Sequence, residues 1–178
     1  MEIGSALRAA NAQCVTGWRV WTVAGTSEGV RLASVIYDTV WLPGGESTAT
    51  CRHEHAHAAP ELDCSCGFYA AHDPVDALSY LQGRDEPRTL CRVLGEVTLT
   101  RAVVETETGY RAAAAYPLRL YCGNEVVAAN LEQVYGVPVL SPGCAFVSAT
   151  SSTPASAGSS TSSWSAARTW SSRMAASG

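Results

Sequence analysis

Alternating apolar and polar residues predict two strands in the first quarter of the chain. Residues 18–23 read Trp-Arg-Val-Trp-Thr-Val between two glycines, the pattern of a half-buried strand. A longer run rich in β-branched residues, 31–41, predicts a second strand, and residues 24–29 supply a turn between the two. The Leu-Pro-Gly-Gly sequence at 42–45 ends the second strand with turn residues.

The middle of the chain predicts one short strand and one short helix. Residues 67–70 leave a polar segment as a brief buried strand. Asp73 is a suitable helix N-cap and Pro74 suits the first helical position, so we expect a helix that ends near Gly83.

The last third of the folded part predicts a hairpin followed by a helix. Residues 93–104 and 110–121 are strand-rich, and the polar segment between them ends in Gly109, which is typical of a hairpin. Apolar residues three to four apart then predict a helix capped by Asn124 and closed by Gly136. Residues 137–140 predict an edge strand.

These elements together predict an α+β fold. The short connections make most neighbouring strands antiparallel, so we expect a small curved antiparallel sheet or SH3-like barrel with two short helices and a Cys/His loop. We divide the chain into an N-terminal arm or short helix at 1–16, a single globular domain at 17–142, and a tail at 143–178. The tail is rich in Ser, Ala and Thr and lacks apolar periodicity, so we predict that it is disordered.

Composition narrows the classes of protein that fit. The net charge is −4 at pH 7 and every basic residue is a scattered arginine, so we do not expect a nucleic-acid partner. The use of Arg without Lys, with much Ala and Gly, indicates a high-GC genome such as that of an actinobacterium. No apolar run is long enough for a membrane span and no signal-peptide layout opens the chain, so we expect no membrane partner and a cytoplasmic location. Its 7 cysteines are then expected as thiols and metal ligands.

All 4 histidines and three of the cysteines fall between Cys51 and His72. Structural zinc takes four Cys or His ligands in a tetrahedron, and this segment is the obvious source of such a set. The predicted zinc ligands are Cys51, His57, Cys64 and Cys66. Pro60 predicts a bend that brings His57 back toward the Cys-x-Cys pair, whereas His53, His55 and His72 are the alternatives for the fourth position.

Two enzymatic readings and one purely structural reading compete with this interpretation. Two histidines spaced i, i+2 on a strand chelate a catalytic metal and leave a position open for water, with Glu54 or Asp63 as base. Alternatively, Cys64 or Cys66 is a nucleophile whose pKa a nearby histidine lowers. In the plainest reading the segment is a His-rich surface loop whose thiols pack as small apolar groups.

Other polar and aromatic residues are expected to be structural. We expect core or rim positions for the tryptophans, buried thiols outside the loop, outward-facing arginines on the second hairpin strand, and solvated glutamates at the hairpin turn. The residues concerned are Trp18, Trp21, Trp41, Cys91, Cys122, Cys144, Arg111, Arg119, Glu105 and Glu107.

Several short motifs together resemble a family of uncharacterised actinobacterial proteins of this size. They are Trp41-x-Pro43-Gly44, Cys51, His57-Ala58-Ala59-Pro60, Cys64-x-Cys66-Gly67-Phe68-Tyr69-Ala70, and the stretch from Gly95-Glu96-Val97 to Tyr116-Pro117. The resemblance covers roughly residues 17–140 and implies no known activity. It implies an actinobacterial source and treats the Cys/His segment as one unit.

From the sequence we therefore expect a small cytoplasmic domain, stabilised by zinc in the 51–66 loop, that serves as a binding or adaptor module. We expect it not to be an enzyme, and its partner is an unidentified protein or small molecule. The alternative is a metal- or thiol-dependent hydrolase or transferase that uses the same Cys/His cluster.

Overall fold

A computed structural model of the chain describes residues 9–10, 14–37, 39–53, 57–83 and 85–142. Its strands are β1 (Ala9–Ala10), β2 (Val15–Thr26), β3 (Gly29–Ser34), β4 (Val40–Trp41), β5 (Ser47–Thr48), β6 (Phe68–Ala71), β7 (Thr89–Thr106), β8 (Gly109–Tyr121) and β9 (Val139–Leu140). The helices are α1 (Pro74–Ala77), the 3-10 helix η1 (Leu78–Leu81) and α2 (Glu125–Tyr135). All the described strands belong to one sheet, in which only β9 runs parallel to its neighbour.

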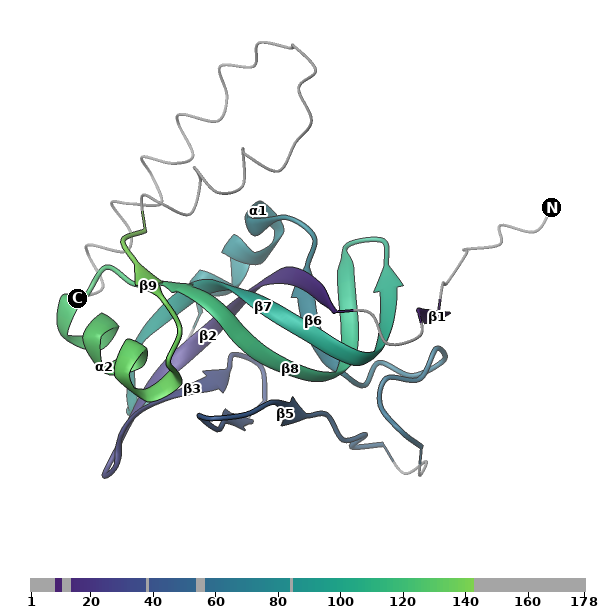
Figure 1. Cartoon of the computed structure of the whole chain (residues 1–178), viewed down its shortest axis with the longest axis horizontal. Helices are drawn as coiled ribbons and strands as arrows, with labels where there is room; N and C mark the ends of the chain where they lie inside the picture. Colours follow the sequence, from purple (N-terminus) through teal and green to yellow (C-terminus); the bar gives the residue numbers. More distant parts are fainter. Residues whose placement is uncertain (1–8, 11–13, 38, 54–56, 84, 143–178) are drawn as a thin grey trace, which may run out of the picture.

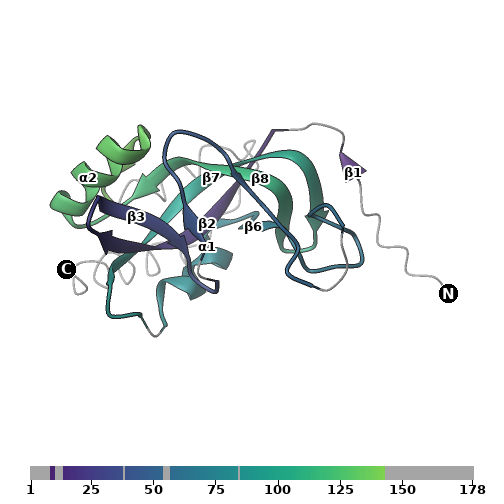
Figure 2. The same cartoon turned by 90° about the horizontal axis from the view of Figure 1, so that it is seen from below.

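Four of the strands pair in a closed ring, which makes the centre of the molecule a small barrel (Figures 1 and 2). Strand β2 pairs with β7, β7 with β8, β8 with β6, and β6 returns to β2 at the single pair Trp18 and Ala71. At this junction a Cβ on Gly17 would lie 2.7 Å from the Cβ of Ala70, so only glycine lets β2 and β6 approach so closely. The α+β class and the antiparallel sheet predicted from the sequence are confirmed.

One edge of β8 organises the short strands of the molecule. β9 pairs with its C-terminal end, β5 with Ala114 and Ala115 in the middle, and β6 with its N-terminal part. The chain therefore leaves this edge after β5 and returns to it at Phe68, opposite Ala112. The intervening Cys/His segment is an excursion whose two ends are anchored almost side by side.

The two predicted helix starts are confirmed by their caps. The Asp73 carboxylate accepts the backbone N–H of Val75 at 2.8 Å, and Pro74 opens α1. The Asn124 side chain accepts two backbone N–H groups at the start of α2, at 3.0 and 3.1 Å. Gly136 ends α2 in the left-handed conformation, with φ of 65°.

The single strand predicted for 31–41 is wrong. β3 ends at Ser34, the chain turns, and β4 pairs back antiparallel with β3. The Ser34 backbone N–H donates to the Thr39 carbonyl at 2.9 Å, and the Trp41 indole N–H donates to the Ser34 hydroxyl at 3.1 Å. β-Branched residues suit either strand of a hairpin, so composition could not reveal the turn between them.

The chain termini are described only in part. Ala9–Ala10, within the segment expected as an arm or short helix, pairs with β7, and β2 begins at Val15. The predicted disordered tail, residues 143–178, lies outside the described residues, as does Cys144.

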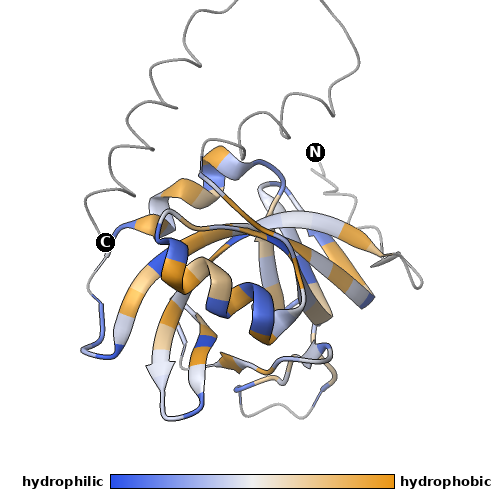
Figure 3. Cartoon of the chain, turned by 60° about the vertical axis from the view of Figure 1, so that its left-hand side comes forward, coloured by the Kyte–Doolittle hydropathy of each residue, from blue (hydrophilic) through white to orange (hydrophobic). Residues whose placement is uncertain are grey.

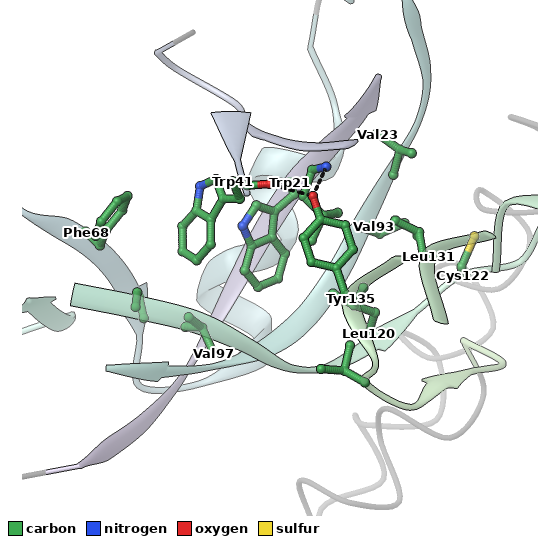
Figure 4. Packing of buried hydrophobic residues seen from close by; sticks show 14 of the residues in the cluster. Trp21, Val23, Trp41, Phe68, Val93, Val97, Leu120, Cys122, Leu131 and Tyr135 are labelled. Atoms are coloured by element: carbon green, nitrogen blue, oxygen red, sulfur yellow. Dashed lines mark hydrogen bonds between the residues drawn. The ribbon is translucent and has the colours of Figure 1, made fainter. Parts of the chain in front are cut away.

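The larger of two buried clusters is built by the barrel strands together with β3, β4 and α2 (Figure 4). The Trp21 and Trp41 rings, both fully buried, meet edge to face with centroids 5.4 Å apart, and Phe68 packs 4.8 Å from Trp41. Tyr135 anchors α2: its hydroxyl accepts the Leu32 N–H at 2.7 Å and donates to the Trp41 carbonyl at 2.6 Å. Apolar residues recur along α2 and the strands that it covers (Figure 3), so the helix holds β3 and β4 against the barrel.

Candidate metal centre

Three thiols and one imidazole converge in the segment between β5 and β6. The ligand atoms of Cys51, His57, Cys64 and Cys66 all lie within 4.8 Å of one another. The Cys51 and Cys64 sulfurs are 3.7 Å apart, and the Cys66 sulfur is 3.9 Å from Nδ1 of His57. A tetrahedral zinc with Zn–S bonds of about 2.3 Å places two thiolate sulfurs about 3.8 Å apart, so the spacing fits a bound ion.

Backbone pairing places the first two candidate ligands opposite each other. Thr50 and Ala58 form an isolated antiparallel bridge, so their neighbours Cys51 and His57 face each other across it. The Ala49 N–H donates to the Ala113 carbonyl of β8 at 2.7 Å and fixes the entry to this segment. The two arms of the loop are thus held at the distance that a shared metal requires.

A tight turn supplies the other two candidate ligands. The Cys64 N–H donates to the Glu61 carbonyl at 3.3 Å, which folds the chain before the Cys-x-Cys pair. Gly67 follows with φ of +120°, a conformation that other residues rarely adopt. A Cβ there would also lie 3.3 Å from the Ala112 carbonyl, so Gly67 allows the turn to close directly onto β8.

Arg111 of β8 organises this turn, and its prediction as an outward-facing residue is wrong. The side chain is buried and donates to the backbone carbonyls of the turn: to Glu61 and Cys66 at 3.1 Å each, to Leu62 at 3.4 Å, and to Cys64. The Cys/His segment covers this face of β8, so a strand position that alternation assigns to solvent lies under a loop. The run Ala112 to Ala115 was the available signal, because a continuous apolar run without alternation is typical of a strand that is covered on both faces.

The other histidines have different neighbours. His72 lies 3.5 Å from the Glu105 carboxylate and packs edge to face on Tyr110, with ring centroids 4.5 Å apart. His53 lies 3.4 Å from the Ser65 hydroxyl, and neither it nor His72 belongs to the four-residue group. His55 and Glu54 lie outside the described residues.

The local hydrogen bonds prepare one thiol for ionisation. Burial disfavours the Cys64 thiolate, but hydrogen bonds from the Cys66 backbone and from the Cys66, Cys51 and His57 side chains outweigh it and lower its pKa to about 7. Burial raises the pKa of Cys66 instead. A hydrogen bond with the Ala58 backbone, followed by one with Cys64, raises the pKa of His57. Thiolates are the form that binds a metal, so the lowered pKa prepares Cys64 to act as a ligand.

Comparisons with protein-family models, with curated proteins and with solved structures find no match. No helix among the described residues is long and apolar enough to cross a membrane. The chemical character of the four-residue cluster is therefore the basis for the functional proposal.

Proposed function

We propose that this chain is a small zinc-stabilised domain that serves as a binding or adaptor module, with Cys51, His57, Cys64 and Cys66 as the zinc ligands. The observation that carries the proposal is the convergence of these three thiols and one imidazole. Soft sulfur and imidazole donors suit zinc, whereas magnesium and calcium prefer oxygen.

The ligand count favours a structural role over a catalytic one. Catalytic zinc sites keep three protein ligands and leave a fourth position for water or substrate, whereas four protein side chains close the tetrahedron. In the proposed site the chain itself supplies the fourth ligand. A metal-dependent hydrolase or transferase would need one of these ligands to leave the metal.

Zinc would stabilise a segment that has little apolar packing of its own. Between β5 and β6 the hydrophobic residues buried among those described are Ala59 and Cys66. Such a long loop loses conformational entropy when it is ordered, and four metal bonds offset that loss in place of a core. Arg111 would complement the charge, because three thiolates and one neutral imidazole leave the zinc complex with a net charge of about −1.

The proposed binding role rests on the surface next to this loop. Large apolar residues after β3 and around β4 are strongly exposed: Ile36, Tyr37, Val40 and Leu42. The guanidinium of Arg52 lies 5.3 Å from the Tyr37 ring centroid and donates to the Thr39 hydroxyl at 3.2 Å, which connects this surface to the Cys/His loop. Exposed apolar residues that lie close together are typical of interaction surfaces.

We propose a cytoplasmic location, where thiol ligands stay reduced, and an actinobacterial source.

Metal substitution tests the closed site. The protein expressed with cobalt in place of zinc should show the intense visible absorption of four-coordinate thiolate cobalt, unchanged when small anions are added. An anion-dependent spectrum would indicate an open position and would support the alternative enzymatic role. Replacement of Cys14, which is exposed and belongs to another part of the chain, should leave the spectrum unchanged.

A further inference from the structure

Two further thiols, which the zinc proposal does not use, lie where the β7–β8 hairpin ends. Cys122 directly follows β8 and Cys91 lies near the start of β7, and the strand register places both on the same face of the sheet as diagonal neighbours. Both pack in the main buried cluster, with Cys122 5% exposed and Cys91 less completely covered. They come from neighbouring strands, since Leu94 of β7 pairs with Tyr121 of β8.

Cys122 also lines a groove between α2 and β9. The groove has a volume of about 360 Å³, and small or apolar residues such as Ala128, Ala129 and Val139 form part of its wall. The Cys122 backbone N–H donates to the Leu140 carbonyl at 3.0 Å, which holds the residue at the junction of β8 and β9. A small molecule in this groove would therefore lie against Cys122.

The surroundings make Cys122 the more reactive of the two thiols. The interaction with the Cys91 side chain lowers the pKa of Cys122 to about 7 against the effect of burial. The same contact with Cys122, together with burial, raises the pKa of Cys91. The protonated Cys122 thiol donates to the Asn124 carbonyl at 3.5 Å. Asn124 is the N-cap of α2, so the positive end of the helix dipole also favours a thiolate at Cys122.

The charge of the groove restricts its ligand. Glu125 and Glu132 both line it, and α2 carries no basic residue. These carboxylates repel an anionic ligand and attract a cationic one.

We propose that Cys122 and Cys91 form a dithiol exchange site whose groove between α2 and β9 takes a small cationic disulfide. The Cys122 thiolate attacks one sulfur of the disulfide, a mixed disulfide forms at Cys122, and the first thiolate leaves. Cys91 then loses its proton and attacks the Cys122 sulfur, which forms the Cys91–Cys122 disulfide and expels the second thiolate. Both leaving thiolates take up the protons released by the two cysteines, so the chain is oxidised by two electrons and the small disulfide is reduced.

Cystamine, the dicationic disulfide of cysteamine, is the probe that tests this site. The zinc-loaded full chain is incubated with cystamine near pH 7, alkylated and mapped by peptide mass spectrometry. The wild type should gain a Cys91–Cys122 disulfide without retaining cysteamine, and the C91S variant should instead trap cysteamine on Cys122. The C14S variant, which lacks an exposed thiol elsewhere, should behave as the wild type does at this pair.

Three disulfides of different charge test the groove. Cystamine should react at Cys122 roughly tenfold faster than neutral hydroxyethyl disulfide, and anionic oxidised glutathione should be slower still. The double variant E125Q/E132Q should remove most of this ranking. Equal rates for the three probes in the wild type would overturn the assigned ligand class.

The peptide map of the wild-type chain decides the outcome even if a variant fails to fold. Modification confined to Cys14 or to the zinc ligands, with Cys91 and Cys122 left as free thiols, would overturn the proposal. A first adduct on Cys91 instead of Cys122 would also overturn it.

Discussion

The guanidinium of Arg111 donates a hydrogen bond of 3.1 Å to the backbone carbonyl of Cys66. This contact joins a strand of the barrel directly to the turn that carries two of the four candidate zinc ligands. Further bonds from the same side chain reach the carbonyls of Glu61, Leu62 and Cys64. Arg111 of the barrel therefore holds the Cys/His segment through its backbone carbonyls and not through the side chains of the candidate ligands.

Replacing Arg111 should damage both the fold and the site. In R111M the turn loses its donor and several covered carbonyls lose their partner, so we expect the free energy of unfolding to fall by about 2–4 kcal/mol. Zinc affinity should fall by about 10- to 100-fold, as expected when support for metal ligands is removed. Urea unfolding and competition with a zinc-binding dye measure the two effects.

The matched control is R88M, because Arg88 is exposed on the chain before β7. Its unfolding free energy should change by less than about 0.5 kcal/mol. Equal behaviour of the two variants would show that the Arg111 hydrogen bonds do not support the loop.

Metal-free protein should become more stable as pH rises from 7 to 9, because Cys64 and Cys122 both ionise more readily in the folded chain. The pKa of Cys64 is about 7 in the folded chain against 9.0 for the ordinary thiol, so the folded state releases the proton first. The stabilisation is complete above pH 9 and is lost as pH falls through 7. Melting temperatures of the chelator-treated chain, measured across this range under reducing conditions, test the effect.

The C64S variant provides the comparison for this pH dependence, because its hydroxyl does not ionise in that range. Its melting temperature should rise less between pH 7 and 9 than that of the wild type. Parallel curves for the two proteins would show that Cys64 is not the group responsible.

Tyr135 should be important for stability through its hydroxyl. In Y135F the Leu32 N–H and the Trp41 carbonyl both lose a buried partner, so we expect a loss of about 1–3 kcal/mol in the free energy of unfolding. Y80F is the matched control, since Tyr80 is 47% exposed. Denaturant unfolding of both variants measures the difference, and similar losses would contradict a specific role for the buried hydroxyl.

Removal of the α2 cap should have a smaller effect. N124A leaves the N–H groups of Val126 and Val127 without their side-chain acceptor, so we expect a loss of about 1 kcal/mol. N124S should recover most of that loss because a serine hydroxyl also caps helices. Thermal unfolding followed by circular dichroism distinguishes the two variants, and an unaffected N124A would mean that the cap is not needed.

Helices and strands whose ends are marked by capping residues or glycines could be predicted from the sequence. Asp73-Pro74, Asn124 and Gly136 determine helix ends through contacts within a few residues, so their chemistry is readable along the chain. The hairpin strand 110–121 was equally clear, because Gly109 marks where it begins.

Features that depend on distant residues could not be predicted in the same way. The turn between β3 and β4 brings Trp41 against Trp21 and Phe68, which come from other strands. Burial of Arg111 arises because a loop some 50 positions away covers β8. Among the candidate ligands, by contrast, the four predicted residues are the four that the structure brings together, since Pro60 and the Cys-x-Cys spacing restrict how one short segment folds.

Elemental analysis of the full chain, purified without a histidine tag under reducing conditions, tests the zinc proposal most directly. We predict about one zinc per chain in the wild type and in C14S, and loss of that zinc with lower thermal stability in C64S or C66S. A wild-type chain that holds no metal, and whose stability the C64S and C66S substitutions leave unchanged, would contradict the account.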